Sequence, residues 1–458
     1  MRAKILRMII LIALCILAGG SLLQAQQRFP KPEFETGYVQ PSPTTPEPRA
    51  VTMEYFDVIV LVAMLALVSW LVVKRRSRRG ILWVSIFALI YFGFYRDGCI
   101  CSIGAIQNVA LSIFDPGYAI SISALLFFLA PLLFALFFGR VFCGGVCPLG
   151  AIQDLLVIKP ISVPSWVRKT LGFIPVLYLG LAVLFAATGS DFIICRYDPF
   201  VGIFRMDGPF LMISLGILFL LLGMFFARPY CRVFCPYGVM LSWMSFFSRK
   251  HLTITPSECI KCKLCKDSCP FDAIEVPVDQ KYRSPEVSRS NLRKFILYVA
   301  LIPVLAILFG WIGSRSHVFL SRVHPDVYLA ELMIHHPELR QDEDNLDIQA
   351  FLKSGETFDE LVERAGMIRE KYKTGGWVLG AFLGLVLGIM LMNQVVFRKK
   401  EIYEPHRGNC LSCGRCMDYC PVERVDSPNP VEGSPESLLR RQGTRGGGWK
   451  LDVKRLKM

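Results

Sequence analysis

Long apolar stretches alternate with polar segments along most of the chain. A membrane-spanning helix needs about 20 predominantly apolar residues, and seven stretches come close to this length. They are residues 55–74, 80–95, 119–138, 172–189, 209–227, 294–313 and 376–397. The pattern predicts an all-α polytopic membrane protein with about seven transmembrane helices. One more apolar segment near residues 5–22 follows three basic residues, and we expect either a cleaved signal peptide or an N-terminal anchor.

The polar segments divide the chain into units around these spans. We expect residues 1–25 to form the signal peptide or anchor, residues 26–53 a proline-rich outer linker, and residues 54–250 the membrane core. Three further units follow: a cytoplasmic ferredoxin-like segment at 251–293, a transmembrane hairpin at 294–397 whose outer loop covers 314–375, and a cytoplasmic tail at 398–458.

Composition and charge fit this picture. The chain has 458 residues, of which 53% are hydrophobic, and its formal net charge is +14. Basic residues follow the first span as Lys74, Arg75, Arg76, Arg78 and Arg79. Because basic loops stay in the cytoplasm, we expect a bacterial inner-membrane protein whose C-terminus and cysteine-rich segments are cytoplasmic. No basic recognition module is visible, so we expect no nucleic-acid partner.

Two runs of four cysteines share the spacing C-x2-C-x2-C-x3-C-P. The first contains Cys259, Cys262, Cys265 and Cys269, and the second contains Cys410, Cys413, Cys416 and Cys420. This spacing is typical of [4Fe–4S] binding, in which the fourth cysteine ligates the other cluster. Zinc is the main alternative, although zinc sites usually separate two C-x2-C pairs by a longer loop.

The two runs predict one split ferredoxin domain of the α+β kind with two [4Fe–4S] clusters. We expect Cys420 to complete the cluster of the first run and Cys269 to complete the cluster of the second. The two spans between the runs return the chain to the side of the membrane where it began. Both runs would then meet on the cytoplasmic side.

A second cysteine motif, C-x3-C-P-x-G, also occurs twice. It contains Cys143 and Cys147 in one copy and Cys231 and Cys235 in the other, and Arg140 and Arg228 precede the two copies. This indicates an internal duplication of about 85 residues. The four thiols are expected to converge, as a further iron–sulfur or metal centre, as a redox dithiol pair, or as structural turns.

Three more cysteines, Cys99, Cys101 and Cys195, fall in the outer segments. In an oxidising compartment cysteines can pair, and three leave one over. The alternative hypothesis is that they ligate an outer electron-transfer centre.

Other cofactor motifs are missing from the sequence. No histidine falls inside any of the seven spans, and no C-x-x-C-H occurs, so we expect no haem. A Walker A sequence is also missing, which argues against nucleotide-driven transport.

Taken together, the spans, the paired C-x3-C-P motifs and the ferredoxin runs resemble the NosR/NapH-type membrane polyferredoxins. The resemblance covers residues 55–275, and 410–421 in kind. It implies electron transfer between the quinone pool and respiratory reductases, often in denitrification, with the eight ferredoxin cysteines and the four C-x3-C-P cysteines as functional positions. The chain departs from the family in two ways, because it lacks the large outer flavin domain and its ferredoxin runs are split by two spans. The first departure suggests a separate flavoprotein partner.

The sequence therefore predicts a membrane-bound iron–sulfur electron-transfer protein. It would relay electrons between the quinone pool or cytoplasmic donors and a partner reductase or flavoprotein, as a subunit of an oxidoreductase complex rather than a stand-alone enzyme, with no catalytic residues of its own. The alternative is an iron–sulfur redox sensor, or a maturation or regulatory membrane protein for a respiratory reductase.

Overall fold

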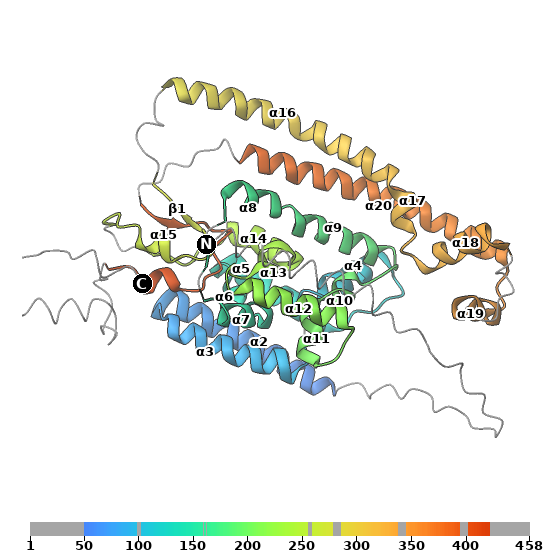
Figure 1. Ribbon diagram of the computed structural model, residues 1–458, viewed down its shortest axis with the longest axis horizontal. Helices are drawn as coiled ribbons and strands as arrows, with labels where there is room; N and C mark the ends of the chain where they lie inside the picture. The colour runs from blue at the N-terminus through green and yellow to red at the C-terminus, as the bar shows by residue number, and fades with distance from the viewer. Residues whose placement is uncertain are drawn as a thin grey trace, which may run out of the picture.

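The computed structural model describes residues 50–98, 102–158, 160–161, 163–254, 259–277, 285–337, 345–393 and 402–421. Within these ranges the chain is mostly helical, with one two-stranded sheet. Many of the helices run along the long axis of the molecule (Figure 1). A largely helical protein with few strands agrees with the predicted fold class.

The first helical hairpin forms one edge of the molecule (Figure 1). Helix α2 (Val51–Trp70) continues into the π-helix η1 (Leu71–Arg75), and α3 (Arg78–Ala88) continues into the π-helix η2 (Leu89–Tyr95). The turn between them places Arg76 at φ 54°, and the Ser77 hydroxyl caps α3 by accepting a hydrogen bond from Gly80 N at 3.2 Å. Leu65 and Val68 of α2 are fully buried, so this hairpin packs into the hydrophobic core.

The duplicated region forms the middle of the molecule. Its first half contains α4 (Ala105–Phe114), α5 (Ile122–Phe138), α6 (Val141–Gly145) and α7 (Pro148–Leu155). Its second half contains α9 (Ile174–Ala187), α10 (Ile193–Arg196), α11 (Pro199–Arg205), α12 (Phe210–Gly223), α13 (Pro229–Val233) and α14 (Pro236–Phe246), and α8 (Ser165–Leu171) lies between the halves. In both halves a five-residue helix carries the start of the C-x3-C-P motif, and the proline begins the next helix, where its missing N–H costs nothing.

A second long hairpin lies along the opposite edge (Figure 1). It consists of α16 (Pro285–Arg315) and α20 (Phe358–Met392), which are joined through α17 (His317–Ser321), α18 (Pro325–His335) and α19 (Leu346–Ser354). A capping box formed by Thr357 and Glu360 begins α20. The predicted outer loop is therefore largely helical, and the helix of the last span begins well before its apolar part.

Among the described residues, three helices are long and apolar enough to cross a membrane: Val51–Arg75, Leu292–Arg315 and Phe358–Met392. A fourth crossing is possible if α11 and α12, which meet at 100°, form one broken span. Ala105–Phe114, Ile122–Phe138 and Ile174–Ala187 are apolar but shorter than a full span. These helices support a location in the membrane, and the count of seven spans stays a prediction.

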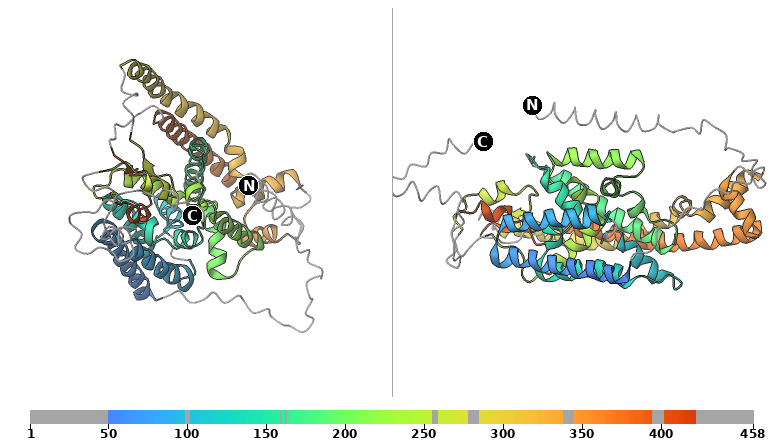
Figure 2. Two further views of the ribbon diagram at one scale, coloured as in Figure 1. Left: turned by 60° about the vertical axis from the view of Figure 1, so that its left-hand side comes forward. Right: turned by 90° about the horizontal axis from the view of Figure 1, so that it is seen from below.

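The two cysteine runs come together at one end of the molecule, opposite to α18 and α19 (Figures 1 and 2). The first run carries α15 (Leu264–Ser268) and the strand β1 (Ile274–Glu275), and the second carries β2 (Glu404–Pro405) and α21 (Arg415–Asp418). The strands pair antiparallel, with Ile274 opposite Pro405 and Glu275 opposite Glu404. This pairing joins segments about 130 residues apart in sequence into one small domain.

Candidate metal centres

The first cavity of the ferredoxin domain is lined by cysteines from both runs. Cys259, Cys262 and Cys265 of the first run face Cys420 of the second, and Tyr403 and Ile254 complete an apolar wall. The cavity has a volume of about 310 Å³ and opens in part to solvent. Cys262 lies at its exposed edge.

The second cavity has the reciprocal lining. Cys410, Cys413 and Cys416 of the second run face Cys269 of the first. Its volume is about 330 Å³, and Leu252, Phe271, Ile274 and Leu411 are among its apolar wall residues. The two cavities thus group the eight cysteines as the expected exchange of fourth ligands requires. Ligation itself stays a prediction.

The backbone adopts the same conformation in both runs. The second residue after the first cysteine has positive φ in each, at Lys261 (54°) and Ser412 (53°). The residue after the second cysteine also has positive φ, at Lys263 (66°) and Gly414 (78°). Left-handed residues turn successive N–H groups toward a common point and form concave anion-binding sites, which occur at many iron–sulfur clusters. Both loops are therefore shaped to surround an anionic centre.

The buried thiols of this domain are costly to ionise without a positive centre beside them. Burial raises the pKa of Cys410 to about 12 and the pKa of Cys265 to about 11. Metal ligation needs the thiolate. An apolar cavity with four thiols fits an iron–sulfur cluster, because the iron would compensate the buried charge.

The four C-x3-C-P cysteines lie near one another beneath this domain. Cys235 caps α14 and accepts a hydrogen bond from Gly238 N at 3.3 Å, while Gln153 Nε2 donates to Cys231 Sγ at 3.4 Å. Burial raises the pKa of Cys235 well above its usual value, and the nearby Cys231, Cys143 and Cys147 raise it further. The four thiols thus lie near enough to influence one another's charge, and their convergence on one centre stays a prediction. We call them the four-thiol group.

Two arginines tie the duplicated halves together by reaching across to the other copy. Arg228, from the second half, donates to the carbonyl oxygen of Cys143. If Gly150 carried a β-carbon, that carbon would lie 3.0 Å from Arg228 Nη1. Arg140, from the first half, donates to Cys143 Sγ at 3.7 Å, and its Nη2 would lie 3.1 Å from a β-carbon at Gly238. Each glycine of C-x3-C-P-x-G therefore makes room for the arginine of the opposite copy.

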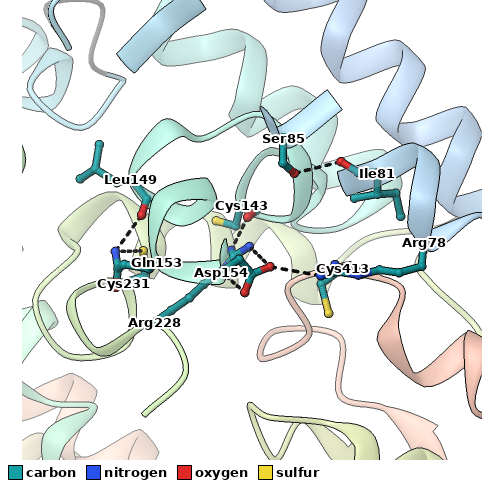
Figure 3. Close-up of polar contacts among 10 residues, drawn as sticks. All are labelled: Arg78, Ile81, Ser85, Cys143, Leu149, Gln153, Asp154, Arg228, Cys231 and Cys413. Carbon is teal, nitrogen blue, oxygen red and sulfur yellow. Dashed lines mark hydrogen bonds and ion pairs between the residues drawn. The ribbon is translucent and has the colours of Figure 1, made fainter. Parts of the chain in front are cut away.

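The charge of Arg228 is balanced by Asp154 (Figure 3). The guanidinium donates to both carboxylate oxygens, at 3.1 and 2.9 Å, and the two side chains are 1% and 8% exposed. Burial raises the pKa of Asp154, but the charge and hydrogen bond of Arg228, together with the charges of Arg78 and Arg415, lower it overall. Asp154 and Gln153 were not predicted from the sequence, because neither residue is repeated in the second copy of the motif. The equivalent positions there are Ser242 and Leu241.

The second run rests directly on the four-thiol group. A β-carbon at Gly144, inside the first C-x3-C-P motif, would lie 2.5 Å from the carbonyl oxygen of Leu411. Arg78 Nη1 donates to the carbonyl oxygen of Cys413 at 2.6 Å, and Arg140 Nη1 donates to that of Gly408 at 3.3 Å. The second cavity therefore lies beside the four-thiol group.

Other cysteine predictions remain open. Cys99 and Cys101 lie outside the described residues, and Cys195 lies exposed on α10.

Among the residues that the structure describes, no three histidine, cysteine, aspartate or glutamate side chains are close enough to hold a single metal ion. A mononuclear zinc site would need its thiolates about 2.3 Å from one ion. The described cysteines do not have that spacing, in either the cavities or the four-thiol group.

Comparison with known proteins adds sequence families to this geometry. Models of a 4Fe-4S binding domain match residues 120–174 and 208–255, residues 252–275, and residues 407–423. The chain is 32% identical over 205 residues to an uncharacterised protein of Methanocaldococcus jannaschii (MJ0750). The matched region covers 42% of this chain and 82% of that protein. It is 25% identical to the regulatory protein NosR of Stutzerimonas stutzeri, over 47% of this chain and 33% of NosR.

The chain belongs to the NosR-type membrane iron–sulfur proteins. A third relative is YccM of Escherichia coli, described as a candidate electron transport protein, which is 26% identical over 34% of this chain and 48% of YccM. The chain thus spans most of the archaeal relative but only a third to a half of NosR and YccM. No solved structure matches the chain significantly. The resemblance to this family is confirmed, and so are iron–sulfur clusters as its cofactors.

Proposed function

We propose that the chain is a membrane-bound electron relay with two [4Fe–4S] clusters in its split ferredoxin domain. The observation that supports this most directly is the reciprocal lining of the two cavities, with three cysteines of one run and one of the other in each. In this proposal neither run can hold a complete cluster alone. The antiparallel pairing of β1 with β2 keeps the fourth cysteines in place.

The relay has an order because the two cavities differ in their surroundings. The first opens at the surface beside the exposed Cys262. The second is lined by the buried Cys413 and Cys416 and lies beside the four-thiol group. We infer a sequence of sites from the first, surface cavity to the second cavity, whose cysteines are more buried, and then to the four-thiol group at the membrane core. A third iron–sulfur centre in the four-thiol group is part of the proposal, and its rivals are a dithiol pair or structural turns.

A bound [4Fe–4S] cluster supplies the capacity to take up and give up one electron. The residues around the cavities set the reduction potential at which this happens. Phe271, Leu411 and Ile274 give the second cavity apolar walls, and Arg78 and Arg140 bring positive charge to its loop. Burial and nearby charge are the levers that tune cluster potentials.

The finer partners belong to the same proposal. Quinone or quinol at the membrane and a separate flavoprotein or reductase would be the two ends of the relay, with the C-terminus in the cytoplasm of a bacterial inner membrane. The name of YccM agrees with electron transport. An outer centre at Cys99, Cys101 and Cys195 would extend the path, and the loss of iron from a variant with all three changed to serine would support it.

Serine variants of the two fourth cysteines test the exchange of ligands. In anaerobically purified Cys420→Ser protein we expect an altered electron paramagnetic resonance signal from the cluster of the first run, because that cavity loses one of its four thiols. Cys269→Ser is the matched variant and should alter the signal of the second. Iron near eight per chain in the wild type indicates two clusters, and clearly more indicates a centre at the four-thiol group.

Two results would contradict the proposal. One is a Cys420→Ser protein in which only the signal of the second run changes, since each run would then bind its own cluster. The other is wild-type protein that contains no iron after anaerobic purification.

A second function is favoured by the name of a relative. NosR is described as a regulatory protein, so a redox sensor or regulatory membrane protein is the alternative. Stopped-flow mixing with a quinol analogue, a reduced ferredoxin and a flavoprotein separates the two. Exchange of electrons with these partners supports a relay, whereas intact clusters that exchange with none of them support a sensor.

A further inference from the structure

Three exposed lysines lie in the cysteine run of the first cavity, and one of them, Lys263, lines the cavity. Lys261, Lys263 and Lys266 alternate with the cysteines of the first run, and all three side chains are exposed. The run from 259 to 269 contains one acidic residue, Asp267, so its formal charge is three positive minus one negative, or +2. Cys262 lies exposed among the lysines, at the open edge of the cavity. We call these three residues the lysine face.

The second run has different residues at the positions equivalent to the lysine face, and there they are buried or half-buried. Because the two runs share spacing and backbone conformation, the positions equivalent to the lysines are Ser412, Gly414 and Met417. All three are uncharged. Ser412 is only 2% exposed, and a β-carbon at Gly414 would lie 3.1 Å from Ile81 Cδ1 of α3. In the second run this face is therefore buried against the membrane core, and in the first run it is exposed and positive.

Backbone conformation does not account for lysine at these positions. Lys261 and Lys263 both have positive φ, which non-glycine residues seldom adopt. The equivalent of Lys263 is Gly414, for which positive φ is unstrained. A left-handed backbone is unfavourable for a non-glycine residue, because its β-carbon comes too close to the following carbonyl oxygen. Lysine is thus present in spite of the local conformation, which indicates a use for its charge.

We propose that the lysine face docks a small water-soluble electron-carrier protein with an acidic surface around its own redox group. The proposal rests on the electron relay described above and names its partner at the surface cavity. Opposite charge on two such faces steers encounter and fixes orientation, and electron-transfer complexes are often small and weak. One electron would leave the reduced carrier, which is thereby oxidised, and would reduce the cluster that the four cysteines of the first cavity would hold, with no bond made or broken.

The test measures carrier binding by the full-length protein in nanodiscs of neutral lipid. The probe is an acidic [2Fe–2S] ferredoxin in its oxidised form, and the variant combines Lys261→Gln, Lys263→Gln and Lys266→Gln. We expect its Kd to rise roughly tenfold or more and the salt dependence of binding to flatten, because the steering charge is lost. The matched control changes three exposed lysines at the opposite end, Lys353, Lys371 and Lys373, to Gln and should bind like the wild type.

Three outcomes would overturn the docking proposal. The first is a lysine-face variant with wild-type Kd and salt dependence. The second is an equal loss of affinity in the control, which would mean that only net charge matters. The third is wild-type protein that binds no carrier in neutral nanodiscs while the lysine face alters binding to phosphatidylglycerol vesicles, which would make it a lipid contact. Iron content and the dithionite-reduced resonance spectrum report separately on the relay, so the two proposals fail in distinguishable ways.

Discussion

At the scale of single residues, a buried ion pair connects the parts at the centre of the molecule. Arg228 is 1% exposed and reaches from one duplicated half to Asp154 and Cys143 of the other. Its guanidinium also lies over the Phe271 ring, 5.7 Å from the ring centre. One side chain thus connects the two halves with the ferredoxin domain, and its position explains why an arginine precedes each C-x3-C-P motif.

Replacement of Arg228 by glutamine should destabilise the protein most strongly at neutral pH. The variant leaves the buried Asp154 with only Arg78, 3.7 Å away, as an ion-pair partner, and breaking a buried ion pair costs about 3–5 kcal/mol. In the wild type the ion pair lowers the pKa of Asp154 in the folded state, so its contribution is present above the unfolded pKa and is lost as the pH falls through the folded value. In the variant that pKa should rise, because only the charges of Arg78 and Arg415 would then oppose the effect of burial, and acid would relieve the penalty.

Denaturant midpoints of wild type and Arg228→Gln in detergent, measured from pH 7.5 to 4, check this prediction. The difference between the denaturant midpoints of the two proteins should become smaller as the pH falls. Arg196→Gln is the control, because Arg196 pairs with Asp191 at 3.0 Å but is 66% exposed, and such pairs contribute little. A difference that stays constant with pH would show that Asp154 does not carry the effect.

At the scale of elements, a row of glycines lets two long helices approach closely. Gly376, Gly380, Gly384 and Gly388 recur every four residues on α20 and face α16. A β-carbon at Gly376 would lie 2.5 Å from the Gly313 carbonyl oxygen, and one at Gly388 would lie 2.8 Å from Ile302. At Gly380 and Gly384 it would collide with the carbonyl oxygens of Phe309 and Leu305. The hairpin is therefore held by backbone contact rather than by interlocking side chains.

Replacement of Gly380 by valine should force α16 away from α20. Overpacking of a tight contact typically costs about 1–3 kcal/mol, and we expect a lower unfolding midpoint and faster proteolysis of the hairpin in nanodiscs. Gly366→Ala on the same helix is the control, since no atom lies within 4 Å of its β-carbon position. Equal behaviour of the two variants would mean that the glycine row is not a packing surface.

The elements also show how far the sequence could predict the fold. The length of the apolar stretches was enough to predict the helices Val51–Arg75, Leu292–Arg315 and Phe358–Met392 as candidate spans. It could not decide Ile122–Phe138 or Ile174–Ala187, because a short apolar helix can be buried in a protein core as well as in lipid. Nor could it show the 100° break between α11 and α12. Cysteine spacing predicted the grouping in both cavities, whereas Asp154 and Gln153 gave no signal because they are not repeated.

At the scale of the whole molecule, the ferredoxin domain and the helices α17–α19 lie at opposite ends, with the long helices between them (Figure 2). The 25 residues from Val51 to Arg75 rise about 1.5 Å each, or roughly 37 Å, which exceeds a hydrocarbon core of about 30 Å. The α16–α20 hairpin leaves one end and returns to it. Both cysteine runs should therefore face the same compartment, as the split domain requires.

Reporter fusions in a bacterial host test this arrangement and its direction. The basic residues between 74 and 79 lie at the end of the first hairpin that carries the cysteine runs, where Arg78 donates to the carbonyl oxygen of Cys413, so the positive-inside rule predicts that this end faces the cytoplasm. A green fluorescent protein fused after residue 458 should be fluorescent, and alkaline phosphatase fused after residue 345 should be active, because it folds only outside the cytoplasm. The reverse pair, phosphatase after 458 and fluorescent protein after 345, is the control and should be silent. Active phosphatase after residue 458 would place the domain outside, and the lysine face would then have to meet a periplasmic carrier.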